Sequence, residues 1–324
     1  MEKSLPTRNF RVVFAGSPAY AIPSLEALLA LPGCSVVGVL TQKPKPRGRG
    51  NQLHASAIGV FAEAHNLLTL TPNTLRVPEA HALLTALKAD VGVVVAYGKI
   101  LPQAVLNLLP QGWVNAHASL LPRWRGASPI QQTIAAGDVE TGVSLMQLDA
   151  GMDTGPILVQ ERLPVAVDET AVSLAEKLSQ LSGMLIRKHL RTYLDGTLLP
   201  QPQPVTGVTL APQLTKADGH LHFGEAALQL VRKVRAFNPW PGAVMQVGTL
   251  LLKILTATTA PGQEQPGKIV RVPTGFGVGT PQQLFIPLQV QVPGKKPMSA
   301  AEFFHGYNRL LTNDVTGPKS SPTS

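Results

Sequence analysis

Short apolar runs alternate with amphipathic stretches over the first half of the chain. The runs are rich in Val, Ala and Leu and have the length of buried strands. They cover residues 10–15, 35–40, 91–96 and 112–117. The first is followed by a stretch with helical spacing of Ile22, Leu25, Leu28 and Leu29. Apolar strands separated by helices are typical of a parallel sheet that is covered on both faces. The pattern predicts an α/β fold with a doubly wound, mainly parallel sheet.

Sheets of this kind bind ligands beyond the carboxyl ends of their strands. Gly16, Tyr97 and His117 lie at the ends of three predicted strands, so we expect the functional site near them. The turn at residues 15–18 lacks the G-x-G-x-x-G spacing of dinucleotide folds, and no G-x-x-x-x-G-K-[ST] loop occurs. These absences argue against a nicotinamide or flavin cofactor and against nucleotide hydrolysis.

The second half of the chain has a different pattern. A helical stretch at residues 170–193 is followed by three prolines within residues 198–204, which favour an extended linker. After a further helical stretch at 225–237, short β-rich runs alternate with Gly and Pro, as in a small OB-like β-barrel. These runs cover residues 243–247, 250–256, 268–272 and 284–292. The predicted organisation is a catalytic domain at 1–197, a linker at 198–215, a β-barrel at 216–313 and a disordered tail at 314–324.

Composition limits the class of protein. Of 324 residues, 44% are hydrophobic, which is enough for two buried cores. The lone Cys34 excludes an intrachain disulfide and a thiolate metal cluster, as in a reducing compartment. No apolar stretch reaches the ~20 residues that span a bilayer, and the N-terminal sequence has no signal-peptide core. We expect a cytoplasmic, monomeric protein without contact to membranes.

Positive charge is concentrated near the C-terminus. The formal net charge is +9, and residues 216–313 hold 10 Lys and Arg against 4 Asp and Glu, a net of +6. A basic module next to a nearly neutral domain indicates a polyanionic partner.

Three polar residues form the candidate catalytic group. Asn115 and His117 are two positions apart at the end of an apolar run, so a strand would direct both side chains to one face. Asp153 lies in the glycine-flanked segment 149–155, from where its carboxylate could orient the imidazole. Without an obvious nucleophile, the trio suits a reaction between two bound substrates, such as acyl transfer to an amine.

The stretch NAHASLLPRWRGASP at residues 115–129, together with Asp153, closely resembles the folate-dependent formyltransferases, and among them the branch that formylates initiator methionyl-tRNA. Further matching stretches are PRGRG at 46–50, VVAYG at 94–98, RAFNPWP at 235–241 and GKKPMS at 294–299. The resemblance implies 10-formyltetrahydrofolate as the formyl donor, the α-amine of methionyl-initiator tRNA as acceptor, and no metal.

The resemblance also implies roles for individual residues. Asn115 and protonated His117 would stabilise the developing charge on the formyl oxygen, and Asp153 would hold the imidazole and help to move the proton of the amine. Four residues would lie against the folate: Ser119, Leu120, Leu121 and Pro122. Backbone of residues 96–101 and 149–152 is expected near the same cleft.

Cations after the second predicted strand are candidates for contact with tRNA phosphates. They are Lys43, Lys45, Arg47 and Arg49, which alternate with Pro and Gly; the matching loop of the family enters the acceptor stem. Arg123 and Arg125, on either side of Trp124, are candidates for contact with the acceptor end, and packing of Trp124 into the core is the alternative. The regional charge favours a tRNA-facing surface that includes Arg232, Lys233 and Arg235.

Other functions remain open at this point. The same trio would serve formyl transfer to a small amine, such as a glycinamide ribonucleotide or an amino-sugar nucleotide, or hydrolysis of a formyl-folate. A hydrolase that uses Ser119, His117 and Asp153 is another candidate, although no G-x-S-x-G elbow surrounds the serine. A tRNA-binding module without catalysis would leave the polar trio unexplained.

Overall fold

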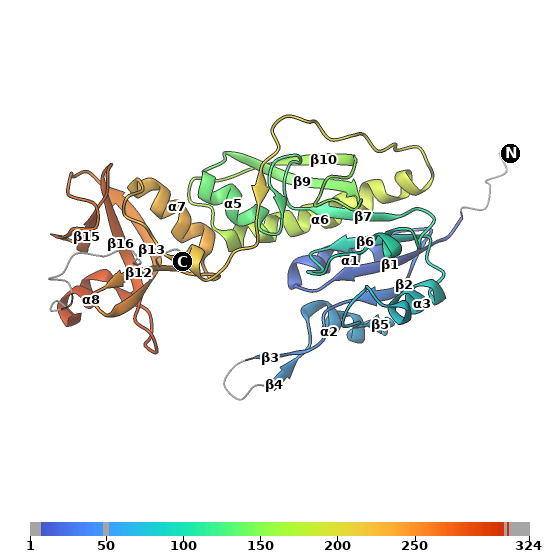
Figure 1. Cartoon of the computed structure of the whole chain (residues 1–324), viewed down its shortest axis with the longest axis horizontal. Helices are drawn as coiled ribbons and strands as arrows, with labels where there is room; N and C mark the ends of the chain where they lie inside the picture. The colour runs from blue at the N-terminus through green and yellow to red at the C-terminus, as the bar shows by residue number, and fades with distance from the viewer. Residues whose placement is uncertain (1–7, 48–51, 308–309, 311–324) are drawn as a thin grey trace, which may run out of the picture. The chain divides into compact units, whose positions relative to one another are not determined.

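The computed structural model describes residues 8–47, 52–307 and 310, and forms two compact units (Figure 1). Unit 1 comprises Met1–Gly126, Glu140–Pro164 and Ala175–Leu210, and unit 2 comprises Ala127–Val139, Val165–Leu174 and Ala211–Ser324. The predicted tail at 314–324 lies outside the described residues. No helix of the described ranges combines the length and the apolar character needed to cross a bilayer.

A seven-stranded sheet forms the centre of unit 1, in the order β10-β9-β7-β6-β1-β2-β5. Five neighbouring strands are parallel: β5 (Thr69–Leu70), β2 (Cys34–Leu40), β1 (Phe10–Gly16), β6 (Val91–Val95) and β7 (Trp113–His117). Two antiparallel strands complete the sheet: β9 (Glu140–Gln147) and β10 (Ile157–Pro164). The predicted α/β fold with a mainly parallel sheet is confirmed.

Both faces of this sheet are covered, because every residue of β6 is buried although neighbouring side chains point to opposite sides. The helical segments along this part of the chain are η1 (Ala19–Ala21), α1 (Ile22–Leu29), α2 (Ala57–Ala64), α3 (Pro78–Ala86), α4 (Gln103–Leu106) and α6 (Ala171–Leu194). Ser56 caps α2 by accepting a hydrogen bond from the backbone N–H of Gly59, at 2.9 Å. Val13, Leu40, Leu84 and Trp113 belong to one core cluster.

Two small strand pairs belong to the loops of the sheet. β3 (Lys45–Arg47) and β4 (Gln52–His54) form an antiparallel hairpin that projects from unit 1 (Figure 1). β8 (Arg125–Gly126) pairs with β11 (Leu210–Ala211), which follows the proline-rich segment. Two of the predicted tRNA-contacting cations, Lys45 and Arg47, are residues of β3.

Unit 2 contains a mainly antiparallel, six-stranded sheet packed against helices. Its strands are β12 (Ala243–Val247), β13 (Leu250–Ala260), β14 (Ile269–Val272), β15 (Gly275–Gly279), β16 (Leu284–Gln291) and β17 (Met298–Ser299), in the order β12-β13-β16-β15-β14 with β17 on β16. The helical segments are α5 (Pro129–Ala136), η2 (Ala217–Gly219), α7 (Ala227–Phe237) and α8 (Ala300–Tyr307). Leu230, Val234, Phe276 and Phe303 belong to its core. The expected β-rich C-terminal module is confirmed as an antiparallel sheet.

Close backbone approaches explain the glycine-rich strand β15. A Cβ atom at Gly279 would lie 2.1 Å from the carbonyl oxygen of Gln265, and one at Gly275 would lie 2.7 Å from the carbonyl carbon of Ala300. The glycines therefore allow β15 to be fully buried, which the apolar pattern of its sequence did not predict.

Candidate active site

The loops at the carboxyl ends of β1, β2 and β6 are joined by hydrogen bonds. The Ser17 hydroxyl donates to the carbonyl oxygen of Tyr97 at 2.9 Å, and the Gln42 side-chain amide donates to the same oxygen at 3.1 Å. The backbone N–H of Gln42 donates to the Ser17 hydroxyl at 3.3 Å. These contacts place the ends of three parallel strands together, as expected for the ligand-binding edge of such a sheet.

Strand β7 places Asn115 and His117 on one face of the sheet. It pairs with β6 on one side and with β9 on the other, so both of its edges are fixed. His117 is buried, with 6% of its side chain exposed, whereas Asn115 is half-buried. The predicted pairing of an amide and an imidazole is therefore present.

Asp153 lies in the connection between β9 and β10 and faces both residues. One carboxylate oxygen, Oδ1, lies 3.4 Å from Asn115 Nδ2, and the other, Oδ2, lies 3.6 Å from His117 Nδ1. Oδ2 also accepts a hydrogen bond from the backbone N–H of Gly126 at 2.9 Å. The structure thus brings together all three residues that the sequence singled out.

The turn that carries Asp153 is held by its own side chains. Asp149 accepts hydrogen bonds from the backbone N–H of Gly151 and from the Thr154 hydroxyl. Asp153 has a φ of +53°, in the left-handed region that Asp tolerates better than most residues. This local network fixes where the carboxylate enters the site.

Both ring nitrogens of His117 face oxygen atoms. Nε2 lies 2.8 Å from the carbonyl oxygen of Trp124, which can only accept, so Nε2 carries a proton. Nδ1 faces the Asp153 carboxylate oxygen Oδ2 at 3.6 Å. Because this distance is beyond hydrogen-bond range, Nδ1 is left open to a substrate oxygen.

The segment Ser119, Leu120, Leu121 and Pro122 lies directly after β7. Ser119 and Leu121 are buried, whereas Leu120 and Pro122 are partly exposed. The Ser119 hydroxyl donates to the carbonyl oxygen of Arg123 at 2.6 Å rather than to His117. This geometry does not favour a hydrolase with Ser119 as nucleophile, and it leaves Leu120 and Pro122 as the side chains that a folate could touch.

The basic loop lies beside a cavity at the same edge of the sheet. Lys43 and Lys45 are exposed and line a cavity of about 420 Å³ together with Ser17, Gln42 and His54. The charges of Lys45 and Lys43 add to the effect of burial in lowering the pKa of Lys99, so positive charge is concentrated here. The backbone of Arg47 pairs with Gln52, its side chain is not described, and Arg49 lies outside the described residues.

Several arginines that the sequence offered as tRNA contacts are engaged within the protein. Arg123 lies over the Trp124 ring at 4.2 Å, and Arg125 donates two hydrogen bonds to the Gln203 side chain. In unit 2, Arg232 donates to the carbonyl oxygen of Ala136 at 3.5 Å, and Arg235 donates to that of Glu169 at 2.8 Å. Lys233 forms an ion pair with Glu225 at 2.6 Å. No motif in the sequence pointed to Gln203, because its contacts are formed only by the folded chain.

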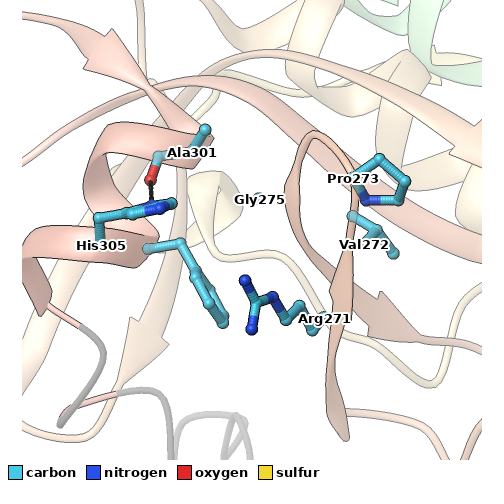
Figure 2. Close-up of a pocket in the computed structure, with 7 residues that line it drawn as sticks. Arg271, Val272, Pro273, Gly275, Ala301 and His305 are labelled. Carbon is cyan, nitrogen blue, oxygen red and sulfur yellow. Dashed lines mark hydrogen bonds between the residues drawn. The ribbon is translucent and has the colours of Figure 1, made fainter.

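Unit 2 has a second basic cavity, of about 330 Å³, between β14, β15 and α8. Figure 2 shows the Arg271 guanidinium and the His305 ring on its walls. Arg271 lies over the Phe304 ring at 5.8 Å, and Nδ1 of His305 lies 3.0 Å from the carbonyl oxygen of Ala301. A cation beside a half-buried aromatic ring can hold a planar, negatively charged ligand.

Comparison with known proteins agrees with this architecture. Residues 11–189 match the family described as formyl transferase, and residues 213–308 match the formyl transferase C-terminal domain. The methionyl-tRNA formyltransferase of Myxococcus xanthus is 45% identical over 298 residues, which cover 92% of this chain and 95% of the relative. That of Janthinobacterium is 44% identical over 309 residues, with 92% and 97% covered. The chain belongs to the methionyl-tRNA formyltransferase family.

Solved structures of low sequence identity share this fold. A sugar 3N-formyl transferase solved with dTDP and 5-N-formyl-THF superposes with a TM-score of 0.63 at 18% identity, covering 89% of this chain and all of that one. A methionyl-tRNA formyltransferase from Clostridium thermocellum superposes with a TM-score of 0.54 at 15% identity, covering 87% of this chain and 98% of that one. These likenesses extend over most of both chains and show that the fold is shared.

Proposed function

We propose that this protein transfers a formyl group from 10-formyltetrahydrofolate to the α-amine of methionyl-initiator tRNA. The observation that carries the proposal is the convergence of Asn115, His117 and Asp153 in a chain of this family. An amide, an imidazole and a carboxylate supply donors and a proton acceptor, while the attacking nitrogen comes from the acceptor substrate. A free α-amine titrates near ~7.7, so a useful fraction is uncharged at neutral pH.

In the proposed reaction, the uncharged amine attacks the formyl carbon and forms the new C–N bond. Negative charge develops on the formyl oxygen, where the amide of Asn115 and the Nδ1 proton of His117 can stabilise it. One preorganised donor of this kind is worth about 3–4 kcal/mol of barrier. The bond from the formyl carbon to N10 of the folate then breaks, and the proton lost by the amine ends on N10.

Asp153 has two tasks in this scheme. Its carboxylate faces His117 Nδ1 and orients the ring, and it accepts the proton of the attacking amine directly or through water. The hydrogen bond from the Gly126 N–H keeps Oδ2 in place for both tasks. The folate itself is proposed to lie against Leu120 and Pro122, with Ser119 and Leu121 supporting the segment from below.

Two basic surfaces support tRNA as the acceptor. Lys45 in β3 and Lys43 just before it line the cavity at the ligand-binding edge, and we propose that they contact phosphates of the acceptor stem together with Arg47 and Arg49. The Arg271 cavity lies on the module that carries a net charge of +6 over residues 216–313, and it offers a second contact for RNA. A small acceptor would need neither surface.

The test is a formylation assay with labelled 10-formyltetrahydrofolate and four acceptors in parallel. Charged initiator tRNA should be formylated, whereas uncharged initiator tRNA, an amino-sugar nucleotide and a glycinamide ribonucleotide should not. Rapid formylation of either small amine, with none of the charged tRNA, would refute the proposal. Release of labelled formate without any acceptor would indicate a formyl-folate hydrolase instead.

A further inference from the structure

The segment that the sequence presents as a linker is anchored in unit 1. Gln201 exchanges two backbone hydrogen bonds with Ile157, both of 2.8 Å, at the start of β10. Gln203 follows two positions later, with its side chain half-buried. This arrangement brings the Gln203 amide to the connection between β9 and β10, which contains Asp153.

The Gln203 amide has a full set of partners. Its Nε2 donates to the carbonyl oxygens of Asp153 and Gly155, both at 2.7 Å. Its Oε1 accepts from the Arg125 guanidinium, at 2.7 Å from Nη2 and 3.1 Å from Nε. Because a guanidinium can only donate and a carbonyl can only accept, one orientation of the amide satisfies all four contacts. Gln203 is therefore held rigidly.

These contacts join the two loops that position the Asp153 carboxylate. One loop contains Asp153, whose left-handed backbone needs support from its surroundings. The other contains Arg125, and the next residue, Gly126, donates its N–H to Asp153 Oδ2. Gln203 thus fixes the backbone of Asp153 relative to the N–H group that holds its carboxylate.

A second residue of the same segment acts on the His117 side. The Trp124 N–H donates to Thr209 Oγ1 at 2.9 Å, and the Arg125 N–H donates to the Thr209 carbonyl oxygen at 3.0 Å. Trp124 has a φ of +60°, an uncommon value for a bulky residue, and its carbonyl oxygen accepts the Nε2 proton of His117. Thr209 thereby helps to hold the partner of the imidazole.

From this geometry we infer that Gln203 is a positioning residue for Asp153 in formyl transfer, and that the proline-rich segment is part of the active site rather than only a connection. The inference rests on the proposed function for its kinetic consequence. A displacement of a reacting group by about 1 Å can reduce a rate about 100-fold, so loss of the Gln203 bridge should lower kcat while substrate binding persists.

The first experiment compares Gln203→Met with Gln201→Met in the full-length protein. Gln201 is a matched control, because its exposed side chain makes only a 3.5 Å contact to the Leu199 carbonyl and its backbone pairing is unaffected. We expect a fall in kcat of about 10–100-fold for Gln203→Met, KM values for both substrates within about twofold, and near-normal activity for Gln201→Met. If the unsubstituted enzyme is active and Gln203→Met has a normal kcat, the inference is overturned.

A double-mutant cycle separates positioning from general stabilisation. If Gln203 acts through Asp153, Gln203→Met should cause no further loss of the residual rate in an Asp153→Asn background. An equal fractional loss in both backgrounds would show that Gln203 acts elsewhere. Gln203→Glu serves as a second variant should Gln203→Met fold poorly, since it keeps the shape and the Arg125 contact but loses the donor to Asp153; it should lower kcat as well.

A spectroscopic readout tests the same inference without catalysis. With ¹⁵N-labelled histidine, the ring signals of His117, assigned by their loss in His117→Gln, should shift in Gln203→Met and stay unchanged in Gln201→Met. Unchanged His117 signals in Gln203→Met would refute the positioning role. Inactivity of the unsubstituted enzyme towards charged initiator tRNA would count against the proposed function alone, because the NMR comparison would still report on Gln203.

Discussion

At the residue scale, the site consists of Asn115 and His117 on β7 and of Asp153 in the connection between β9 and β10. Asn115 and His117 could be paired from their spacing, because side chains two positions apart on a strand share a face. The approach of Asp153 was an expectation from its position in a glycine-flanked loop, and the folded chain places its carboxylate near both residues. The Trp124 carbonyl as partner of His117 could not be predicted, because it depends on a left-handed backbone that a tryptophan does not signal.

We predict that His117→Ala and Asp153→Asn each lower kcat at least about 100-fold, because each removes a group that stabilises charge in the transition state. Affinity for tRNA should change by less than about twofold, since neither residue lies in the basic loop. Single-turnover formylation measures the first quantity and filter binding the second. Retention of more than a tenth of the normal rate in either variant would exclude a central role for that residue.

At the element scale, the parallel strands were predictable because they are continuous and apolar. The strands β9 and β10 were not, since β9 mixes Thr, Gly, Ser and Gln with apolar residues and β10 exposes charged ones. Their antiparallel pairing positions the connection that contains Asp153. The sequence therefore identified the carboxylate but not the two strands that place it. Long-range pairing, rather than local pattern, decides this part of the fold.

The tight turn after Asp153 makes a prediction about Gly155. A Cβ atom there would lie 2.0 Å from the backbone oxygen of Gln147, so Gly155→Ala must shift the turn. We expect kcat to fall at least about 10-fold with little change in KM for tRNA. Gly224→Ala is the control, because a Cβ atom at Gly224 has no neighbour within 4 Å. Equal activity of the two variants would contradict the prediction.

The β3–β4 hairpin makes a prediction about ionic strength. Exchange of Lys43 and Lys45 for Gln removes two exposed cations and should reduce the slope of log binding constant against log salt by about 2 if each contacts a phosphate. kcat at saturating tRNA should be close to normal, since the catalytic trio is untouched. Binding titrations between low and moderate salt give the slope. An unchanged slope would remove these lysines from the tRNA-binding surface.

At the scale of the whole molecule, the chain resembles curated relatives over 92% of its length and carries both family domains. The excess of positive charge in residues 216–313 could be counted from the sequence, but the residues that form a surface could not. The sequence favoured a basic face formed by Arg232, Lys233 and Arg235. In the structure, these side chains make contacts within unit 2. Arg271 and His305, far apart in sequence, line one cavity (Figure 2).

We predict that Arg271→Gln raises KM for charged tRNA several-fold and reduces the salt slope by about 1, with kcat unchanged. Arg271→Lys keeps the positive charge but loses the flat guanidinium over Phe304, so this variant separates the two contributions to tRNA binding. If the cavity stacks a base, Arg271→Lys should keep the salt slope but still raise KM. Wild-type KM values in both variants would show that RNA does not use this cavity.

The proline-rich segment is held by hydrogen bonds at two places, with an exposed residue between them. Gln201 and Gln203 form hydrogen bonds to unit 1 at one end of the segment, and Thr209 does so at the other end. Val205 lies between these positions and is 92% exposed. Homologues should therefore accommodate extra or missing residues at positions 204–208, where a longer loop costs little. Length changes between 201 and 203 would displace the Gln203 amide from its partners at Asp153, Gly155 and Arg125, so insertions in this stretch should be confined to residues 204–208.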